Sequence, residues 1–430
     1  MYILEQKKTA ALFILSFCLS NSYANEIHTT QQKIIDEQEI KLVSDENQAT
    51  ALSHSLSDVL RVKVVKPQDD TVIRQAQAPE HIIGVPYNKV ILGKDGNHLS
   101  ITGQLSSVGF MANDSLYNRS YITTNDTEDH RLTFQSLYQY TPMLAVGTRI
   151  QFGFNANLSS SVTQFQTAET NIDMRILDLE FTHDKYGKIY FGHGHTSTDD
   201  TAYVDLSGTK IAGRSSVYDI GAGLYFNGSM DAPQVKNYFN ALDGMGRLSR
   251  LRYDSPSFKG FIISSSIIEN NQDDIALKYG QEFNDTKVAF ALSYTSPLSR
   301  SVSNNAEIRG HQSNASASIL FTSGLNFSFA VGKLESNLTS HNSPKYYYLK
   351  PGLKRQLISM GLTALSFDYG QYANFYQSGG TGIAKGIQLV QNIDEVKTTV
   401  YFNFRQFSVK GSDAMLNNIN LVSAGALYKF

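Results

Sequence analysis

The chain has 430 residues, a formal net charge of −2 and a single cysteine, Cys18. This near-neutral balance argues against a nucleic-acid-binding protein, because such proteins carry an excess of Lys and Arg to neutralise phosphate. Cys18 lies in the N-terminal stretch described next, so the rest of the chain has no disulfide, cysteine nucleophile or thiolate metal site.

Residues 1–24 have the pattern of a secretory signal. Lys7 and Lys8 precede an apolar stretch that ends at Leu19, and small residues then lead to Ala24. This order is typical of a signal peptide cleaved after Ala24. The apolar stretch is too short to cross a bilayer as a helix, which takes about 20 apolar residues.

Residues 25–95 form a polar stretch of mixed charge with few aromatic residues. Ile35, Leu42 and Leu56 are separated by multiples of seven residues, so a short helix or a coiled coil is one interpretation. A flexible arm is the other. We predict a periplasmic extension in either case.

From about residue 97 to the end, apolar residues recur at every second position. In 324–332 the apolar positions are Leu325, Phe327, Phe329 and Val331, and small or polar residues lie between them. The same alternation occurs in 148–156, 288–294, 362–372 and 400–405. This period predicts β-strands with one apolar face.

The composition of the polar face favours a membrane barrel over a soluble sandwich, which also alternates. The polar face repeats Ala, Ser, Gly and Asn with an occasional Arg, as a water-filled lumen would. A barrel with an apolar outer band also accounts for 24 Tyr and 24 Phe in a chain that is polar on average. We therefore predict that residues 96–430 form an all-β transmembrane antiparallel β-barrel.

The number of strands is consistent with a closed barrel. Candidate strands begin near residues 97, 130, 147, 173, 186, 248, 259, 274, 287, 311, 324, 344, 357, 384, 396 and 420. Sixteen is an even number, which places both ends of the barrel on one side and lets the first strand pair with the last.

The predicted connections alternate between short and long. Tight turns are expected at 184–185, 255–259, 284–286 and 392–395, and longer loops at 113–129, 157–172, 297–310 and 334–343. We expect the short turns to face the periplasm and the long loops to face outward.

The C-terminus ends on an aromatic residue of an alternating strand. Val422, Ala424, Ala426, Tyr428 and Phe430 share one face. A last strand of this kind resembles the signal that the outer-membrane barrel-assembly machinery recognises. Tyr428 and Phe430 are therefore candidates for a membrane-insertion signal.

The segment between Phe191 and Arg247 is too long for an ordinary hairpin loop. The run from Gly187 through Thr209, together with 250–261, resembles the trimeric porins of Gram-negative bacteria, and the resemblance extends over about residues 97–430. It implies a third loop folded into the barrel, and a homotrimer in the outer membrane surrounded by lipid and lipopolysaccharide. The function it implies is passive diffusion of ions and small hydrophilic solutes through a water-filled channel.

The resemblance also implies a constriction in which acidic residues of the loop face basic residues of the wall. The candidate acids are Asp199, Asp200 and Asp205, and the candidate bases are Arg131, Arg149, Arg250, Arg252 and Arg405. Opposed charges across a narrow aqueous gap would order water and disfavour apolar solutes. Each Asp has the alternative role of a turn residue and each Arg that of a loop anchor. The polar extension and the less obvious arginine cluster depart from the family pattern, which leaves ion preference open.

Three other functions are considered. A substrate-specific channel for sugars or anions is one, although 346–348 offer only a short run of tyrosines and no lysine ladder is visible. An outer-membrane enzyme is another, but no Gly-x-Ser-x-Gly motif is present. His193 and His195 could ligate a metal, but no third ligand has suitable spacing. We predict a non-enzymatic protein without metal or cofactor.

Overall fold

The computed structural model describes residues 90–92, 97–302, 306–336, 342–412 and 415–430. The chain divides into two units, Met1–Lys63 and Val64–Phe430, and all described residues belong to the second. The predicted signal peptide and nearly all of the predicted extension at 25–95 lie outside the described residues. Within the described part of the chain, no helix is long and apolar enough to cross a membrane.

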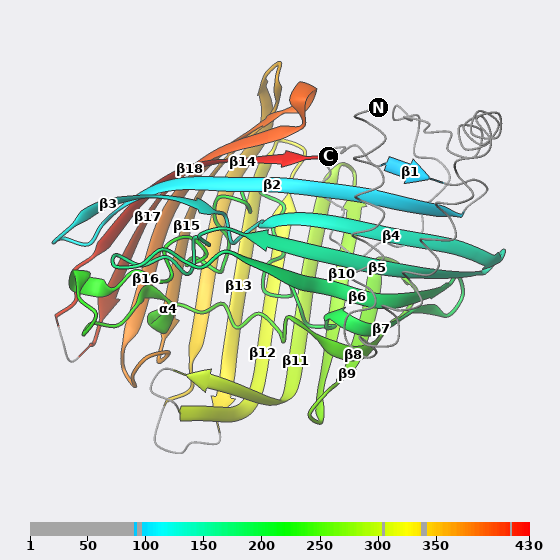
Figure 1. The fold of residues 1–430 in the computed structure, drawn as a ribbon, viewed down its shortest axis with the longest axis horizontal. Coiled ribbons are helices and arrows are strands. Elements are labelled where there is room, and N and C mark those ends of the chain that lie inside the picture. Colours follow the sequence, from blue (N-terminus) through cyan, green and yellow to red (C-terminus); the bar gives the residue numbers. More distant parts are fainter. Residues whose placement is uncertain (1–89, 93–96, 303–305, 337–341, 413–414) are drawn as a thin grey trace, which may run out of the picture. The chain divides into compact units, whose positions relative to one another are not determined.

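The described residues of the second unit form a closed antiparallel barrel (Figure 1). Its strands are β2 (His98–Asn113), β3 (Asn118–Thr124), β4 (His130–Thr141), β5 (Leu144–Asn155), β6 (Asn171–His183), β7 (Gly187–His195), β8 (Arg247–Asp254), β9 (Phe261–Ile268), β10 (Gln272–Phe283), β11 (Thr286–Val302), β12 (Ala306–Leu320), β13 (Leu325–Ser336), β14 (Lys345–Ile358), β15 (Gly361–Ala373), β16 (Thr381–Ile393), β17 (Thr398–Lys410) and β18 (Ile419–Lys429). From β4 onward each strand pairs with the next, and β18 pairs with β2 to close the sheet. A short strand, β1 (Val90–Leu92), lies beside the start of β2.

One strand of the barrel is interrupted. β4 pairs with the first half of β2 and β3 pairs with its second half, so β3 and β4 are two parts of a single barrel strand. Counted in this way, the described residues form sixteen barrel strands, which confirms the predicted number. The observed starts lie within five residues of the predicted ones, as at β12, which begins at 306 where 311 was predicted.

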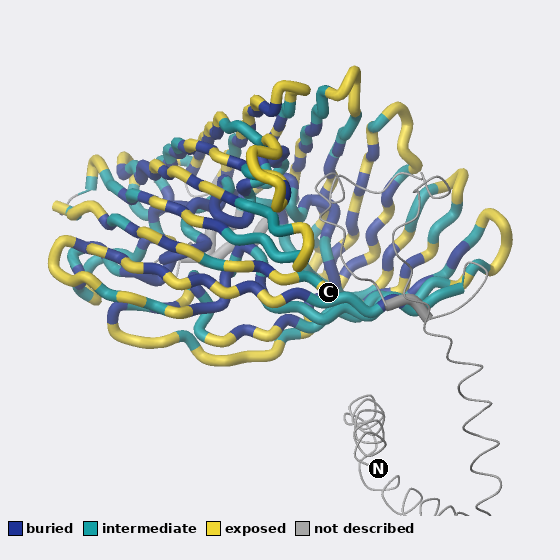
Figure 2. The backbone as a smooth tube through the Cα atoms, turned by 90° about the horizontal axis from the view of Figure 1, so that it is seen from above, coloured by how far each residue is buried: buried dark blue, intermediate teal, exposed yellow. Residues whose placement is uncertain are grey.

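Alternation along the strands separates an outer apolar surface from an inner surface. On β13, Phe327 and Phe329 are 56% and 41% exposed, whereas Asn326 and Ser328 are 0% and 4% exposed. Figure 2 shows the same alternation of buried and exposed residues along most strands. The exposed apolar residues form the outward band that a membrane barrel requires, and the predicted period is confirmed.

Two predicted loops are wrong. The segment predicted as a loop at 113–129 contains β3, which extends the hairpin from β2. At 297–310, β11 runs to Val302 and β12 begins at Ala306, so most of this segment is strand. Both segments are rich in Asn and Ser, which are common in loops, but residues of this kind also occur in strands that face water. The predicted tight turns at 184–185 and 284–286 and the long loop at 157–172 are confirmed.

The seam between β18 and β2 is closed by the last residue. The backbone N–H of Phe430 donates to Gly103 O at 2.9 Å, and Gly103 N donates to Phe430 O at 2.8 Å. The ring of Phe430 lies against Gly103, where an added Cβ would come within 2.3 Å of Cζ. Tyr428 stacks on the same ring at 5.9 Å between centroids. Gly103 therefore leaves the space that the terminal aromatic ring occupies.

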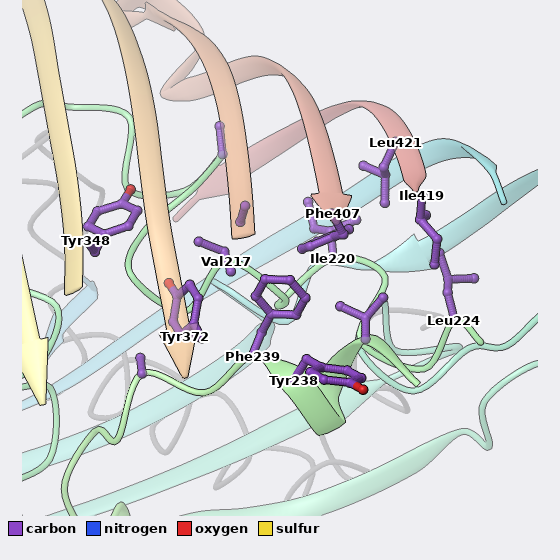
Figure 3. Close-up of a cluster of buried hydrophobic side chains, with 14 of the residues drawn as sticks. Val217, Ile220, Leu224, Tyr238, Phe239, Tyr348, Tyr372, Phe407, Ile419 and Leu421 are labelled. Carbon is purple, nitrogen blue, oxygen red and sulfur yellow. The ribbon is translucent and has the colours of Figure 1, made fainter. Parts of the chain in front are cut away.

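Residues 196–246, here called the inner loop, fold into the barrel between β7 and β8. This loop contains the short helices η2 (Phe226–Gly228) and α4 (Val235–Tyr238), and another short helix, η3 (Asp394–Val396), lies in the turn between β16 and β17. Most of the loop is buried. Figure 3 shows its apolar side chains directed at residues of β14, β15, β17 and β18. The predicted inward-folded loop is thus present.

Candidate pore constriction

The inner loop is attached to the barrel wall by a series of short polar contacts. Thr201 Oγ1 donates to Ser293 Oγ on β11 at 2.9 Å, and the N–H of Leu206 donates to Ser318 Oγ on β12 at 2.9 Å. Further along, Thr209 Oγ1 lies 2.6 Å from Ser366 Oγ on β15. The small hydroxyl residues of the inner wall, which the sequence suggested would face water, therefore bind the loop across neighbouring strands.

One buried ion pair strengthens this attachment, and a second joins two strands of the wall. Lys350 Nζ lies 2.7 Å from Asp205 Oδ2 and donates to Gly213 O at 2.6 Å, and the Lys350 side chain is 0% exposed. On β17, Arg405 Nη2 lies 2.7 Å from Asp368 Oδ2 with both side chains buried. Two of the predicted constriction residues, Asp205 and Arg405, are thus in buried ion pairs on this side of the barrel.

A dry cluster fills the space between the loop and the strands from β14 around to β2 (Figure 3). Phe239 of the loop packs between Tyr372 and Phe407, at 5.3 and 5.1 Å between ring centroids. Leu224 and Leu421 are also fully buried there. This cluster differs from the water-filled lumen that the sequence predicts. The available signal was the inward apolar register of β18, where Ile419, Leu421 and Leu427 occupy the positions expected for polar residues.

The opposite wall, from β4 to β8, carries most of the predicted bases. Arg149 Nη2 and Arg250 Nη2 each lie 2.6 Å from Asp178 Oδ2 on β6. Arg252 Nε lies 2.8 Å from Asp254 Oδ1 on the same strand, β8. The side chain of Arg149 is 21% exposed, whereas that of Arg250 is 0% exposed. Arg250 also donates to the carbonyls of Gly192 and His195 on β7, and Arg252 donates to Thr196 O, so they fix the start of the inner loop.

Arg131 is the most exposed of the predicted bases that form ion pairs on this wall. Its side chain is 24% exposed, and it contacts Asp129 and lies 3.4 Å from Glu128. Both acids come from residues 125–129, which separate β3 from β4 and are here called the inward bulge. Glu128 is not among the predicted constriction residues, because its segment has the composition of an outer loop.

The inward bulge is bound to the inner loop. Asn125 Nδ2 donates to Ile211 O at 3.2 Å, and Thr127 Oγ1 donates to Asp219 Oδ2 at 3.3 Å. Burial and the neighbouring Asp219 raise the pKa of Asp126 to about 6. The signal in the sequence was the cluster of acidic residues at 126–129, which breaks the alternation just before Arg131.

The predicted acids Asp199 and Asp200 lie close to a third carboxylate, Asp243. Oxygen atoms of the three lie within 4.8 Å of one another. Asp243 accepts hydrogen bonds from the N–H groups of Asp200 and Ala202, at 3.0 and 2.8 Å. Burial and the charges of Asp199 and Asp200 raise the pKa of Asp243 to about 8.

The remaining two acids keep their charge. Burial opposes ionisation of Asp200, but the positive charges of Lys210, His195 and Arg214 lower its pKa overall. Burial also opposes ionisation of Asp199, which contacts His195, and the pair lowers the pKa of Asp199. His195 therefore has a partner in the loop. Within the described part of the chain, the three side chains whose ligand atoms lie close enough to share a cation are Asp199, Asp200 and Asp243, and this group includes neither His193 nor His195.

The barrel, its closed seam and its inner loop define the class of protein to which the fold belongs. No family model and no curated protein matches the sequence. Solved structures match it well: the anion-selective porin from Comamonas acidovorans is 12% identical with a TM-score of 0.55, covering 78% of this chain and 100% of that one.

Two further solved structures give the same result. OmpT, an outer membrane protein of Vibrio cholerae, is 15% identical with a TM-score of 0.52, covering 79% of this chain and 99% of that chain. The outer membrane channel DcaP of Acinetobacter baumannii is 9% identical with a TM-score of 0.50, covering 79% and 99%. The chain therefore has the fold of the outer-membrane porins. The predicted resemblance, and with it the multi-pass outer-membrane β-barrel, is confirmed at the level of the fold.

Proposed function

We propose that the protein is an outer-membrane porin, a water-filled channel for passive diffusion of ions and small hydrophilic solutes, and not an enzyme. One observation carries this proposal: charged side chains of the β4–β6 wall stay partly exposed inside the barrel, opposite acids of the inner loop. Arg131 and Arg149 keep 24% and 21% of their side chains exposed. Both arginines are in ion pairs but remain in contact with water, unlike the ion-paired Lys350 and Arg405, whose side chains are 0% and 2% exposed.

In this proposal the predicted residues have two different roles. Asp199 and Asp200 on the loop, with Arg131 and Arg149 on the wall, line the opening. Asp205, Arg250, Arg252 and Arg405 are buried in ion pairs and hold the loop and wall in place. Opposed charges across the opening would polarise the water within it and disfavour apolar solutes.

Asp200→Asn tests the proposal in planar bilayers. The refolded protein should show stepwise conductance, and removing this loop carboxylate should shift the reversal potential toward anion preference. A matched control is Asp231→Asn, which removes an exposed carboxylate elsewhere in the inner loop. Folded protein with no conductance would contradict the proposal; folding can be checked by the mobility shift on heating in SDS.

The assembly is also a proposal. A homotrimer would show conductance steps in threes and a high-molecular-weight band in unheated SDS gels. Phe430 and Tyr428 are proposed as the signal recognised by the barrel-assembly machinery, with lipid and lipopolysaccharide around the barrel. Their exposure, 38% and 43%, leaves both rings accessible on the outer surface.

A sugar-specific channel gains no support. Tyr346 and Tyr348 point inward but are only 4% and 2% exposed, because the inner loop covers them. Aromatic rings that stack on a sugar must line the opening. The ion selectivity of a general channel is therefore the property to measure first.

A further inference from the structure

Four partly exposed charged side chains come together where the inward bulge faces the inner loop. Glu128 of the inward bulge and Arg131 of β4 lie on the wall side, with side chains 27% and 24% exposed and 3.4 Å between Oε2 and Nη1. Asp200 and Lys210 belong to the inner loop and are half-buried. Each element thus contributes one acid and one base.

The two elements are fixed to each other close to these residues. The hydrogen bond from Asn125 to Ile211 O joins the bulge to the loop residue that follows Lys210. At the next residue of the bulge, the N–H of Asp126 donates to Ser159 Oγ at 3.0 Å, and Ser159 Oγ donates to Asp219 O at 2.7 Å. These hydrogen bonds hold the bulge against the inner loop close to the four charged residues.

Opposite signs face each other between the two elements. Arg131 lies within the electrostatic reach of Asp200. Burial opposes ionisation of Glu128, but Arg131, Lys429 and Lys210 lower its pKa to about 2. Among the described residues, no ion pair within 4 Å joins Arg131 to Asp200 or Glu128 to Lys210. Arg131 therefore faces Asp200, and Glu128 faces Lys210, without a direct ion pair across the space between bulge and loop.

Three of the charges next to this group have a close partner of opposite sign. Arg214 Nε lies 2.6 Å from Asp219 Oδ2, Arg175 contacts Asp129, and Asp199 contacts His195. These pairs contribute little net field at a distance, because their opposite charges are close together. Glu128 and Arg131 are also an ion pair, but both stay partly exposed, so with Asp200 and Lys210 they present charges of both signs to the space between bulge and loop.

We infer that Glu128 and Lys210 form a second transverse pair, opposite in polarity to Arg131 and Asp200, and that the constriction favours small zwitterionic solutes. The inference rests on the proposed channel function. A single ion near this ring meets attraction and repulsion of similar size, so the ring gives weak selectivity between anions and cations. A solute with both an ammonium and a carboxylate can place each group beside an opposite charge.

Reversal potentials test the second pair. Glu128→Gln should move the permeability ratio toward anions and Lys210→Met toward cations, each by about two- to five-fold for a unit charge a few ångströms from the ion path. The double variant should return close to the unmodified channel. The control is Lys333→Met with Glu335→Gln, a 2.8 Å pair of the same residue types on the exposed outer surface, which should change nothing.

Liposome swelling tests the solute class. Glycine is zwitterionic, and its isomer glycolamide has the same atoms without formal charge, so their rate ratio removes the effect of pore size. The ratio should favour glycine in the unmodified channel and fall about two-fold or more in the Glu128→Gln, Lys210→Met double variant.

Several outcomes separate this inference from the proposed function. If both single variants conduct with the ion selectivity of the unmodified channel, the second pair is overturned. An unchanged glycine-to-glycolamide ratio in the double variant would overturn it as well. Absence of conductance in folded, unmodified protein would instead overturn the channel itself. A variant that loses the heat-dependent gel shift has not folded, and Glu128→Asp then tests the position, with near-normal selectivity expected.

Discussion

The two sides of the barrel interior use similar residues in different ways. From β10 around to β18 and β2, the packed side, the inner loop covers the wall, and charges such as Lys350 and Arg405 are buried in ion pairs. From β4 to β6, the open side, Arg131 and Arg149 remain partly exposed. An inward position on a barrel strand is therefore not in itself a pore-lining position. The path of the loop decides which inward residues can meet a solute.

The buried pair of Lys350 and Asp205 should have the largest effect on stability. Lys350→Met leaves the Asp205 carboxylate buried without its partner, so unfolding should become easier by about 3–5 kcal/mol. Urea titration of the refolded barrel measures this loss. Lys345→Met at the exposed start of β14 is the matched control. Equal stability of the two variants would mean that the packed side does not depend on this pair.

The apolar cluster of the packed side should have the next largest effect. Leu224 is 1% exposed, and Leu224→Ala should cost about 2–5 kcal/mol through lost burial and the cavity left behind. Met230→Ala is a control in the same loop, because Met230 is 64% exposed. Thermal unfolding of both variants compares them. A small loss for Leu224→Ala would show that the loop is held by polar contacts alone.

The seam at Gly103 should have a smaller effect. Gly103→Ala places a methyl group on the ring of Phe430, and this overpacking should cost about 1–3 kcal/mol. Gly109→Ala on the same strand is the control, since its nearest atoms would lie at 3.7 Å or beyond. The fraction of heat-modifiable, folded barrel after refolding measures the difference. The two variants should not behave alike if the terminal ring closes the seam.

The ion preference of the channel should depend on pH, and this is the smallest of the expected effects. Because the pKa of Asp243 is raised to about 8, its carboxyl is mainly neutral at pH 7 and ionises as the pH rises. Cation preference should therefore increase between pH 6.5 and 9.5, by about two-fold. A raised carboxyl pKa also means that its contribution to stability is fully present below about pH 3.8 and is lost as the pH rises to about 8.

Asp243→Asn is the variant that checks this assignment. It should abolish the change in reversal potential between pH 6.5 and 9.5, while Asp199, Asp200 and Tyr203 stay in place around it. A pH response that persists in Asp243→Asn would assign the titration to another group.

Much of the fold could be predicted because the alternation of apolar and polar residues along each barrel strand indicates which side chains face outward. Phe327 and Phe329 must face lipid and Ser328 must face inward, whatever lies inside the barrel. The contents of the barrel could not be predicted in the same way. Whether Asp205 lines the opening or pairs with Lys350 depends on the three-dimensional path of the inner loop, and the two residues are 145 positions apart. The inward bulge was missed for a related reason, since its polar residues have the composition of an outer loop.

Accessibility of Arg131 tests the open side most directly. Cys18 is the single cysteine and lies in the predicted signal, so Arg131→Cys would give the exported protein one thiol on the open side. A charged methanethiosulfonate reagent should then lower its conductance in planar bilayers. Ser207→Cys, at a fully buried position on the packed side, should not respond. Block of both variants alike, or of neither, would contradict an opening between the inner loop and the β4–β6 wall.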